Sequence, residues 1–153
     1  MGCTTLQSLL TFEKLSYSET GFIGKVPACW IVEGENRVSY TALIRIVECC
    51  REYHWQKDVK PNLISSIDST VKKFEGEFVK PLPLEKDICV LYNILEVRNR
   101  GYSIQFRILD ALTNEIYAML SLVCVFYDLH TGEVVSPPVE VLDNLRKFTQ
   151  KPI

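Results

Sequence analysis

Residues 32–55 constrain the fold most, because they form the one long stretch that reads as an amphipathic helix. From Val38 onward, apolar residues recur at spacings of three and four, which places them on one helical face. Asn36 and Ser39 are both suitable N-caps, since their short side chains can accept hydrogen bonds from first-turn amides. No Gly or Pro interrupts the run before Pro61. We therefore expect one central helix whose apolar face comprises Leu43, Ile46, Val47 and Cys50, with Tyr53 or His54.

The opposite face of this predicted helix is charged. It carries Arg45, Glu48 and Glu52, with Arg51 at its border. Glu48 has arginines three residues to either side, a spacing at which helical side chains meet. Because such charges can simply form a solvated face crossed by weak ion pairs, they do not by themselves indicate a site.

Four strand-like segments follow, and a second helical pattern lies near the end of the chain. The second segment is apolar at nearly every position, as in a strand buried on both faces. The third alternates strictly between apolar and polar residues. Gly76, in the first, predicts a bulge or bend. The segments are 64–79, 88–97, 102–109 and 116–129, and the helical pattern covers 139–149.

The rest of the chain predicts connections and a first strand. Residues 4–17 read as a strand or a strand with a helical lead, 18–31 as a loop followed by a short apolar strand, and 56–62 as a polar connection. The predicted order is strand, helix and antiparallel meander, an α+β architecture in one domain over residues 1–153. The long apolar strands predict that one sheet face covers the helix and the other meets a second subunit.

Composition excludes several classes of protein. The net charge of -2 argues against a nucleic-acid partner, and no apolar run is long enough to span a bilayer. The first ten residues lack the basic start and apolar core of a secretory signal, and Leu6 stands where N-myristoylation requires Ser or Thr. The six cysteines include no Cys-x-x-Cys pair, so we expect reduced thiols in a cytoplasmic protein, with no metal and no cofactor.

The helix and its entry loop carry a family resemblance. They read Glu33-Gly-Glu-Asn36-Arg37-Val38-Ser39-Tyr40, and then Arg45 and Glu48-Cys-Cys-Arg51. This resembles the motif of acyl-CoA thioesterases of the 4-hydroxybenzoyl-CoA type: Asp, two variable residues, Gly-His-Val-Asn-Asn, a Tyr and Glu-x-x-Arg. Residues 74–90, 99–106 and 124–138 resemble later segments of that family. The resemblance implies a hotdog fold, in which a bent antiparallel sheet wraps a long central helix.

The catalytic part of the motif departs from the family. Glu33 stands where the family has its catalytic Asp, and Asn36, Arg37, Ser39 and Tyr40 replace its Gly, His and two Asn. The related phenylacetyl-CoA type places an acid within the helix, seven residues after a Gly; here Thr41 and Glu48 have that spacing, with the Gly lost.

Thioester hydrolysis needs a carboxylate as nucleophile or base, and donors for the developing oxyanion, often amides at a helix N-terminus. We therefore take Glu48 ahead of Glu33 as the catalytic carboxylate, with Asn36 as a catalytic hydrogen-bond donor. Glu33 can equally belong to a solvated loop. The candidate substrate-binding residues are Arg37, Tyr40, Arg100 and Ser103.

Three functions remain open at this point. The first is a thioesterase acting on acyl-CoA or acyl-carrier-protein thioesters, as a homodimer or homotetramer. The second is a hotdog dehydratase that acts on a 3-hydroxyacyl thioester. A resemblance to such dehydratases would imply a His in the loop before the helix together with an Asp or Glu, and no His precedes the helix here. The third is a non-catalytic protein that binds acyl thioesters or a carrier protein.

Overall fold

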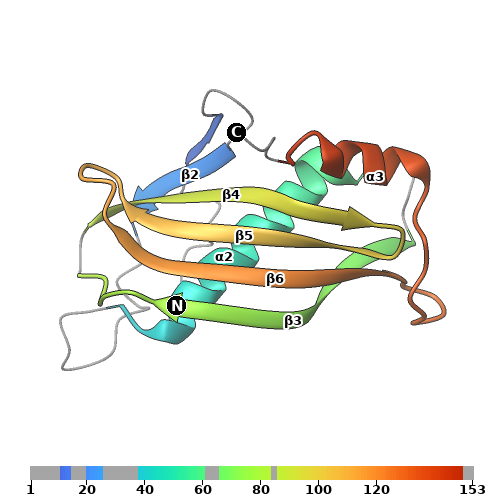
Figure 1. The fold of residues 1–153 in the computed structure, drawn as a ribbon, viewed down its shortest axis with the longest axis horizontal. Coiled ribbons are helices and arrows are strands. Elements are labelled where there is room, and N and C mark those ends of the chain that lie inside the picture. The colour runs from blue at the N-terminus through green and yellow to red at the C-terminus, as the bar shows by residue number, and fades with distance from the viewer. Residues whose placement is uncertain (1–10, 15–19, 26–37, 61–65, 84–85, 150–153) are drawn as a thin grey trace, which may run out of the picture.

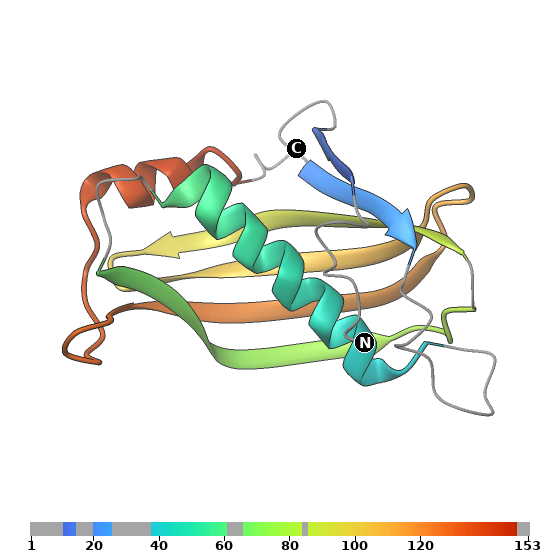
Figure 2. The same cartoon turned by 180° about the vertical axis from the view of Figure 1, so that it is seen from behind.

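The computed structural model describes residues 11–14, 20–25, 38–60, 66–83 and 86–149. Over these residues the chain is α+β, as expected: helix α2 lies obliquely across one face of a six-stranded antiparallel sheet (Figure 1 and Figure 2). The strand order is β1-β2-β4-β5-β6-β3. The strands are β1 Thr11–Lys14, β2 Thr20–Lys25, β3 Ile67–Phe78, β4 Asp87–Arg98, β5 Gly101–Asp110 and β6 Ile116–Asp128; the helices are α2 Tyr40–His54, the π-helical turn η2 Trp55–Val59 and α3 Val139–Arg146.

Helix α2 begins where its sequence signal predicts. Ser39 is the N-cap, and its hydroxyl accepts a hydrogen bond of 3.1 Å from the Ala42 amide. The predicted apolar face is buried, and of its two alternative last members His54 is buried while Tyr53 is half-buried. Arg51, expected at the border of the charged face, is also buried. The polar connection expected over residues 56–62 is wrong in its first half, because η2 continues to Val59, and Val59 is buried in the core.

Replacing the N-cap is expected to have a small, specific effect. Ser39→Ala should lower the free energy of unfolding by about 1 kcal/mol, because the first-turn amide loses its acceptor. Ser39→Asp is the matched control, since aspartate caps as well as serine. Denaturant unfolding measures both. Equal losses in the two variants would show that the cap contributes nothing.

The core lies between α2 and the facing side of the sheet. In β5 and β6 every second residue faces the helix, and the cross-strand pair Phe106 and Leu120 is fully buried there. The intervening residues of β5, such as Ser103 and Gln105, are half-buried on the opposite face. The predicted alternation of residues 102–109 is therefore confirmed.

Three sequence predictions about the strands are wrong. Residues 20–25 form β2 rather than a loop, and their glycines pair within the sheet. The strands after α2 do not form a simple meander, because β3 pairs with β6 at the far edge while β4 lies between β2 and β5. The irregularity in β3 lies between Val71 and Lys73, whereas Gly76 is in register with Leu120.

Two further sequence predictions, for β4 and α3, agree with the structure. Strand β4 is buried on both faces from Val90 to Ile94, then turns outward at Leu95. Helix α3 buries Val141, Leu142 and Leu145 beside the end of α2. The four cysteines in the described ranges, Cys49, Cys50, Cys89 and Cys124, are all free. None of the helices in those ranges is both long and apolar enough to cross a membrane.

Candidate active site

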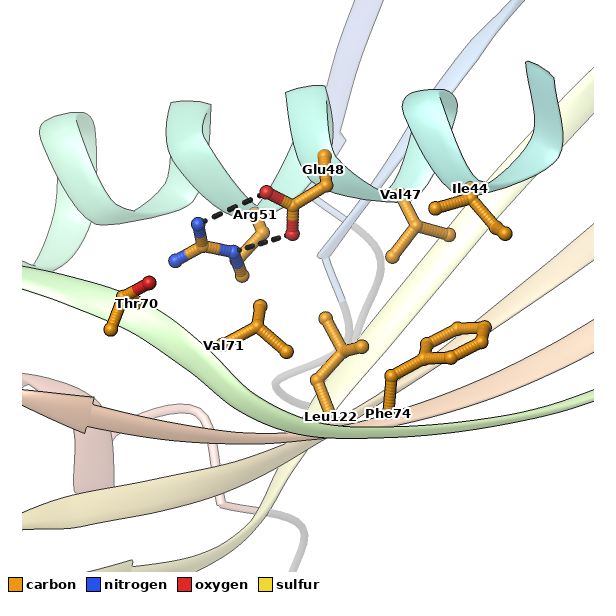
Figure 3. Close-up of a pocket in the computed structure, with 8 residues that line it drawn as sticks. All are labelled: Ile44, Val47, Glu48, Arg51, Thr70, Val71, Phe74 and Leu122. Carbon is orange, nitrogen blue, oxygen red and sulfur yellow. Dashed lines mark hydrogen bonds and ion pairs between the residues drawn. The ribbon is translucent and has the colours of Figure 1, made fainter. Parts of the chain in front are cut away.

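A groove of about 250 Å³ runs between helix α2 and the edge of the sheet formed by β3 and β6. Figure 3 shows its two walls, with helix side chains above and strand side chains below. All but three of its lining residues are apolar, and one of the three is Glu48. The lining comprises Ile44, Val47, Glu48, Arg51, Thr70, Val71, Phe74 and Leu122.

The groove exists because β3 extends beyond the stripe of sheet that the helix covers. Phe74 lies on the helix side of β3 yet is 43% exposed. Gly76 follows on the same face, and a Cβ there would meet Cζ of the Phe74 ring at 3.1 Å. The missing side chain therefore gives the Phe74 ring its space along the groove floor.

Glu48 is the one carboxylate among the groove residues. Its side chain is 43% exposed and is held by Arg51 in a two-point contact, with Nε to Oε1 at 2.9 Å and Nη2 to Oε2 at 3.2 Å (Figure 3). A carboxylate fixed in direction beside an apolar surface is a suitable acid–base or nucleophilic group for an acyl substrate.

Arg51 connects Glu48 to the sheet. Its Nη1 donates to Ser69 Oγ at 2.9 Å, and Ser69 Oγ lies 3.0 Å from the hydroxyl of Tyr102. Burial is the largest single influence on the pKa of Arg51 and lowers it, but the hydrogen bond to Glu48 and the electrostatic attraction of Tyr102, Glu48 and Cys124 together outweigh burial, so the pKa is raised. Burial also raises the pKa of Tyr102. The network therefore pairs a permanent cation with a neutral phenol.

The cysteines near this network are poor nucleophiles. Burial raises the pKa of Cys50 and of Cys124, and it also raises the pKa of Cys49 despite the opposing charge of Arg45. Thiols that remain protonated at neutral pH react slowly, because the thiolate is the attacking species. Among the groove residues, Glu48 is therefore the candidate for nucleophilic or acid–base chemistry.

Of the other predicted catalytic and substrate-binding residues in α2 and the segment before it, Tyr40 lies within the described residues. Glu33, Asn36 and Arg37 lie outside the described residues. Tyr40 is 47% exposed and its ring packs on Phe78 at 4.5 Å. It precedes Glu48 by eight residues, so the first turn of α2 lies about 12 Å along the axis at 1.5 Å per residue. Within one copy, the backbone amides at the N-terminus of α2 are therefore distant from the backbone of Glu48.

Ser103 lies on the other side of the sheet, and Arg100 lies in the turn before β5. Ser103 pairs with Val123, and both alternate with residues that face α2, so they face away from it. A cavity of about 180 Å³ there is lined partly by Lys72, Arg98, Arg100 and Ser103. The structure thus joins two of the predicted substrate contacts to each other and separates them from Glu48.

Sequence reasoning missed the sheet side of the groove. Val71, Phe74 and Leu122 belong to β3 and β6, whose pairing no local pattern predicts. It also assigned no role to Ser69 and Tyr102. The spacing of Glu48 and Arg51 was the one available signal, because residues three apart on a helix meet.

No protein-family model matches the sequence, and no curated protein matches it. Solved structures do match the fold. A predicted thioesterase from Bacillus stearothermophilus has a TM-score of 0.75 at 18% identity, covering 88% of this chain and 98% of its own. A 1,4-dihydroxy-2-naphthoyl-CoA thioesterase from Synechocystis has a TM-score of 0.72 at 13% identity, covering 84% and 96%. A 12:0-ACP thioesterase from Umbellularia californica has a TM-score of 0.74 at 13% identity, covering 92% of this chain and 57% of its own. The chain therefore has the hotdog fold that the family resemblance implied.

Proposed function

We propose that this hotdog protein is a thioesterase that hydrolyses an acyl-CoA or acyl-carrier-protein thioester to the free acid. The observation that carries the proposal is the Glu48 carboxylate, oriented by Arg51 in an apolar groove about 250 Å³ in volume. The names of the Synechocystis and Umbellularia structures, a CoA thioesterase and an ACP thioesterase, support this substrate class.

The apolar groove would hold the acyl chain, and Glu48 would act at the thioester carbonyl. By one route a carboxylate oxygen attacks the carbonyl carbon, the carbon–sulfur bond breaks, the thiolate leaves and water hydrolyses the resulting anhydride. By the other route Glu48 takes a proton from water, and the water oxygen attacks the carbonyl carbon. The carbon–sulfur bond then breaks, and Glu48 returns the proton to the leaving thiolate. Both routes give one acid and one thiol.

The oxyanion donors would come from a second copy of the chain. Within one copy, the start of α2 lies about 12 Å from Glu48 along the helix axis, so we assign the donors for this carbonyl to another copy. β3 is an edge strand of 12 residues in the described sheet and lies beside the groove, so its free backbone groups offer a pairing surface. A homodimer joined there would bring a second α2 to the groove.

The other sequence predictions remain part of the proposal. Asn36 would donate a catalytic hydrogen bond to the carbonyl, and Glu33 would be the alternative catalytic carboxylate. Arg37 and Tyr40 would contact the substrate. Arg100 and Ser103 would contact a phosphate group of a substrate held by a neighbouring copy, in a homodimer or homotetramer. The free thiols of the described cysteines suit a cytoplasmic protein.

The direct test is release of free CoA or carrier-protein thiol, read by chromatography so that the protein's own thiols do not interfere. Short, long and aromatic acyl-CoAs and an acyl carrier protein would be compared. We expect release from at least one substrate at a rate well above that in buffer. Binding of every substrate without release would overturn the thioesterase and leave a binding protein.

One observation favours that second candidate, a non-catalytic protein that binds acyl thioesters. Both oxygens of Glu48 accept hydrogen bonds from Arg51, as they would in a purely structural ion pair. No comparable observation favours the dehydratase: His54 is buried among aromatic rings, and no histidine of the described residues lines the groove.

A further inference from the structure

We propose that Arg51, held by Ser69 and Tyr102, is a positioning residue that sets the direction of the Glu48 carboxylate. This inference rests on the proposed thioesterase function. It assigns a role to a buried polar network that joins three elements, α2, β3 and β5. Arg51 itself would not touch the reacting atoms.

The hydrogen bonds of Arg51 leave its guanidinium little freedom to move. Nε and Nη2 donate to the two oxygens of Glu48, and Nη1 donates to Ser69 Oγ at 2.9 Å and to the Ser69 carbonyl at 3.4 Å. All three nitrogens therefore have partners. The planar fork matches a carboxylate at two points, which fixes its orientation as well as its distance.

Burial distinguishes the ion pair of Arg51 and Glu48 from an ordinary ion pair on a helix surface. Arg51 is 8% exposed, Ser69 5% and Tyr102 3%. The Tyr102 ring packs on Phe126 at 5.6 Å, so the far end of the network is anchored in the core. An exposed pair costs side-chain entropy each time it forms. Here the sheet has already ordered the guanidinium.

The consequence is a carboxylate aimed along the groove. Each carboxylate oxygen accepts from more than one direction, so the bonds to Arg51 leave lone pairs for water or a thioester. In Figure 3, Glu48 lies along the helix between Arg51 on one side and Val47 and Ile44 on the other. Phe74 and Leu122 lie on the opposite wall. Loss of the fork would free the Glu48 side chain to rotate, and a misplacement of 1 Å can cost about 10²-fold in rate.

The test compares steady-state kinetics of Arg51→Ala, Arg51→Lys and wild type on the substrate that wild type hydrolyses. We expect Arg51→Ala to lower kcat by about 30- to 100-fold while KM changes less than about 3-fold. Millimolar guanidinium ion should restore part of that kcat in Arg51→Ala and none in Glu48→Gln. Arg51→Lys should have a kcat below that of wild type, because an ammonium group is a point charge without the planar fork of the guanidinium.

Two further variants separate positioning from folding. Tyr102→Phe removes only the hydroxyl that holds Ser69, and should lower kcat about 3- to 10-fold with the thermal midpoint nearly unchanged. Arg146→Ala is the matched control, because Arg146 forms an exposed i,i+3 pair with Asp143 at 3.1 Å on α3. It should leave kcat unchanged.

The outcomes distinguish the two proposals. An inactive wild type would defeat the thioesterase itself. An active wild type with full kcat in Arg51→Ala and Tyr102→Phe would defeat only the positioning role. If Arg51→Ala does not fold, Tyr102→Phe alone decides. Arg51→Ala could also lose activity that guanidinium ion does not restore, while Tyr102→Phe keeps wild-type kcat. That result would assign Arg51 to stability instead of positioning.

Discussion

Glu48→Gln is expected to lower kcat by about 10³-fold, because an amide neither takes a proton from water nor attacks a carbonyl carbon. The substitution keeps the size of the side chain and one oxygen that can accept a hydrogen bond from Arg51. Substrate binding depends on the apolar walls of the groove, so KM should change little. Chromatographic measurement of released thiol would follow both quantities.

Glu52→Gln is the control for this prediction. Glu52 lies one helical turn beyond Glu48, is exposed, and does not line the groove. Its variant should keep wild-type kcat. If Glu48→Gln retained more than about a tenth of wild-type kcat, Glu48 would not be the catalytic carboxylate, since loss of a general base costs about 10²- to 10⁴-fold. Glu33→Gln would then be the next variant.

The second large effect concerns stability in acid. His54 is 1% exposed and lies against the rings of Tyr92 and Phe148, at centroid distances of 4.7 and 4.5 Å. Burial lowers its pKa from 6.5 to about 3. Between these values the unfolded chain binds a proton that the folded chain does not, so stability is present above pH 6.5 and falls as the pH drops toward 3.

We expect His54 to cost about 3 kcal/mol of unfolding free energy between pH 7 and pH 4, at 1.36 kcal/mol per pKa unit. Denaturant unfolding at pH 7, 5 and 4 measures the slope. His54→Phe should flatten the slope, because phenylalanine fits an aromatic contact and does not titrate. His130→Gln is the control, since His130 is exposed in a turn and its loss should leave the slope as in wild type.

Another titrating group acts in a separate window. Hydrogen bonds from the backbone amides of Thr113 and Leu112 lower the pKa of Asp110 from 3.8 to about 2. Its contribution is therefore present above pH 3.8 and is lost below it. An equal acid slope in wild type and His54→Phe between pH 6.5 and 4 would contradict the assignment to His54.

Local patterns predicted the elements of this fold well. The spacing from Leu43 to Cys50 predicted α2 and its buried face, and Ser39 was one of two predicted caps. Alternation in residues 102–109 predicted both faces of β5. These features depend on residues within a turn or two of each other, and the physical preferences involved act over that range.

Non-local pairing explains what the sequence could not predict. The mixed polarity of β3 reflects its edge position, but nothing local says which edge it occupies. The groove wall of Val71 and Leu122 depends on that pairing. For the same reason Glu48 could be selected as a candidate, while Ser69 and Tyr102, 18 and 51 residues from Arg51, could not.

The position of β3 also sets an order of events during synthesis. Its first residue, Ile67, pairs with Asp128, about 60 residues later in the chain. At roughly 5–20 residues per second, β3 leaves the ribosome several seconds before its partner strand exists. During that interval Val71 and Phe74 lack their partner strand, because β6 has not yet been synthesised. The groove is therefore among the last parts of the molecule to be assembled, and a nascent chain that ends before β6 has none.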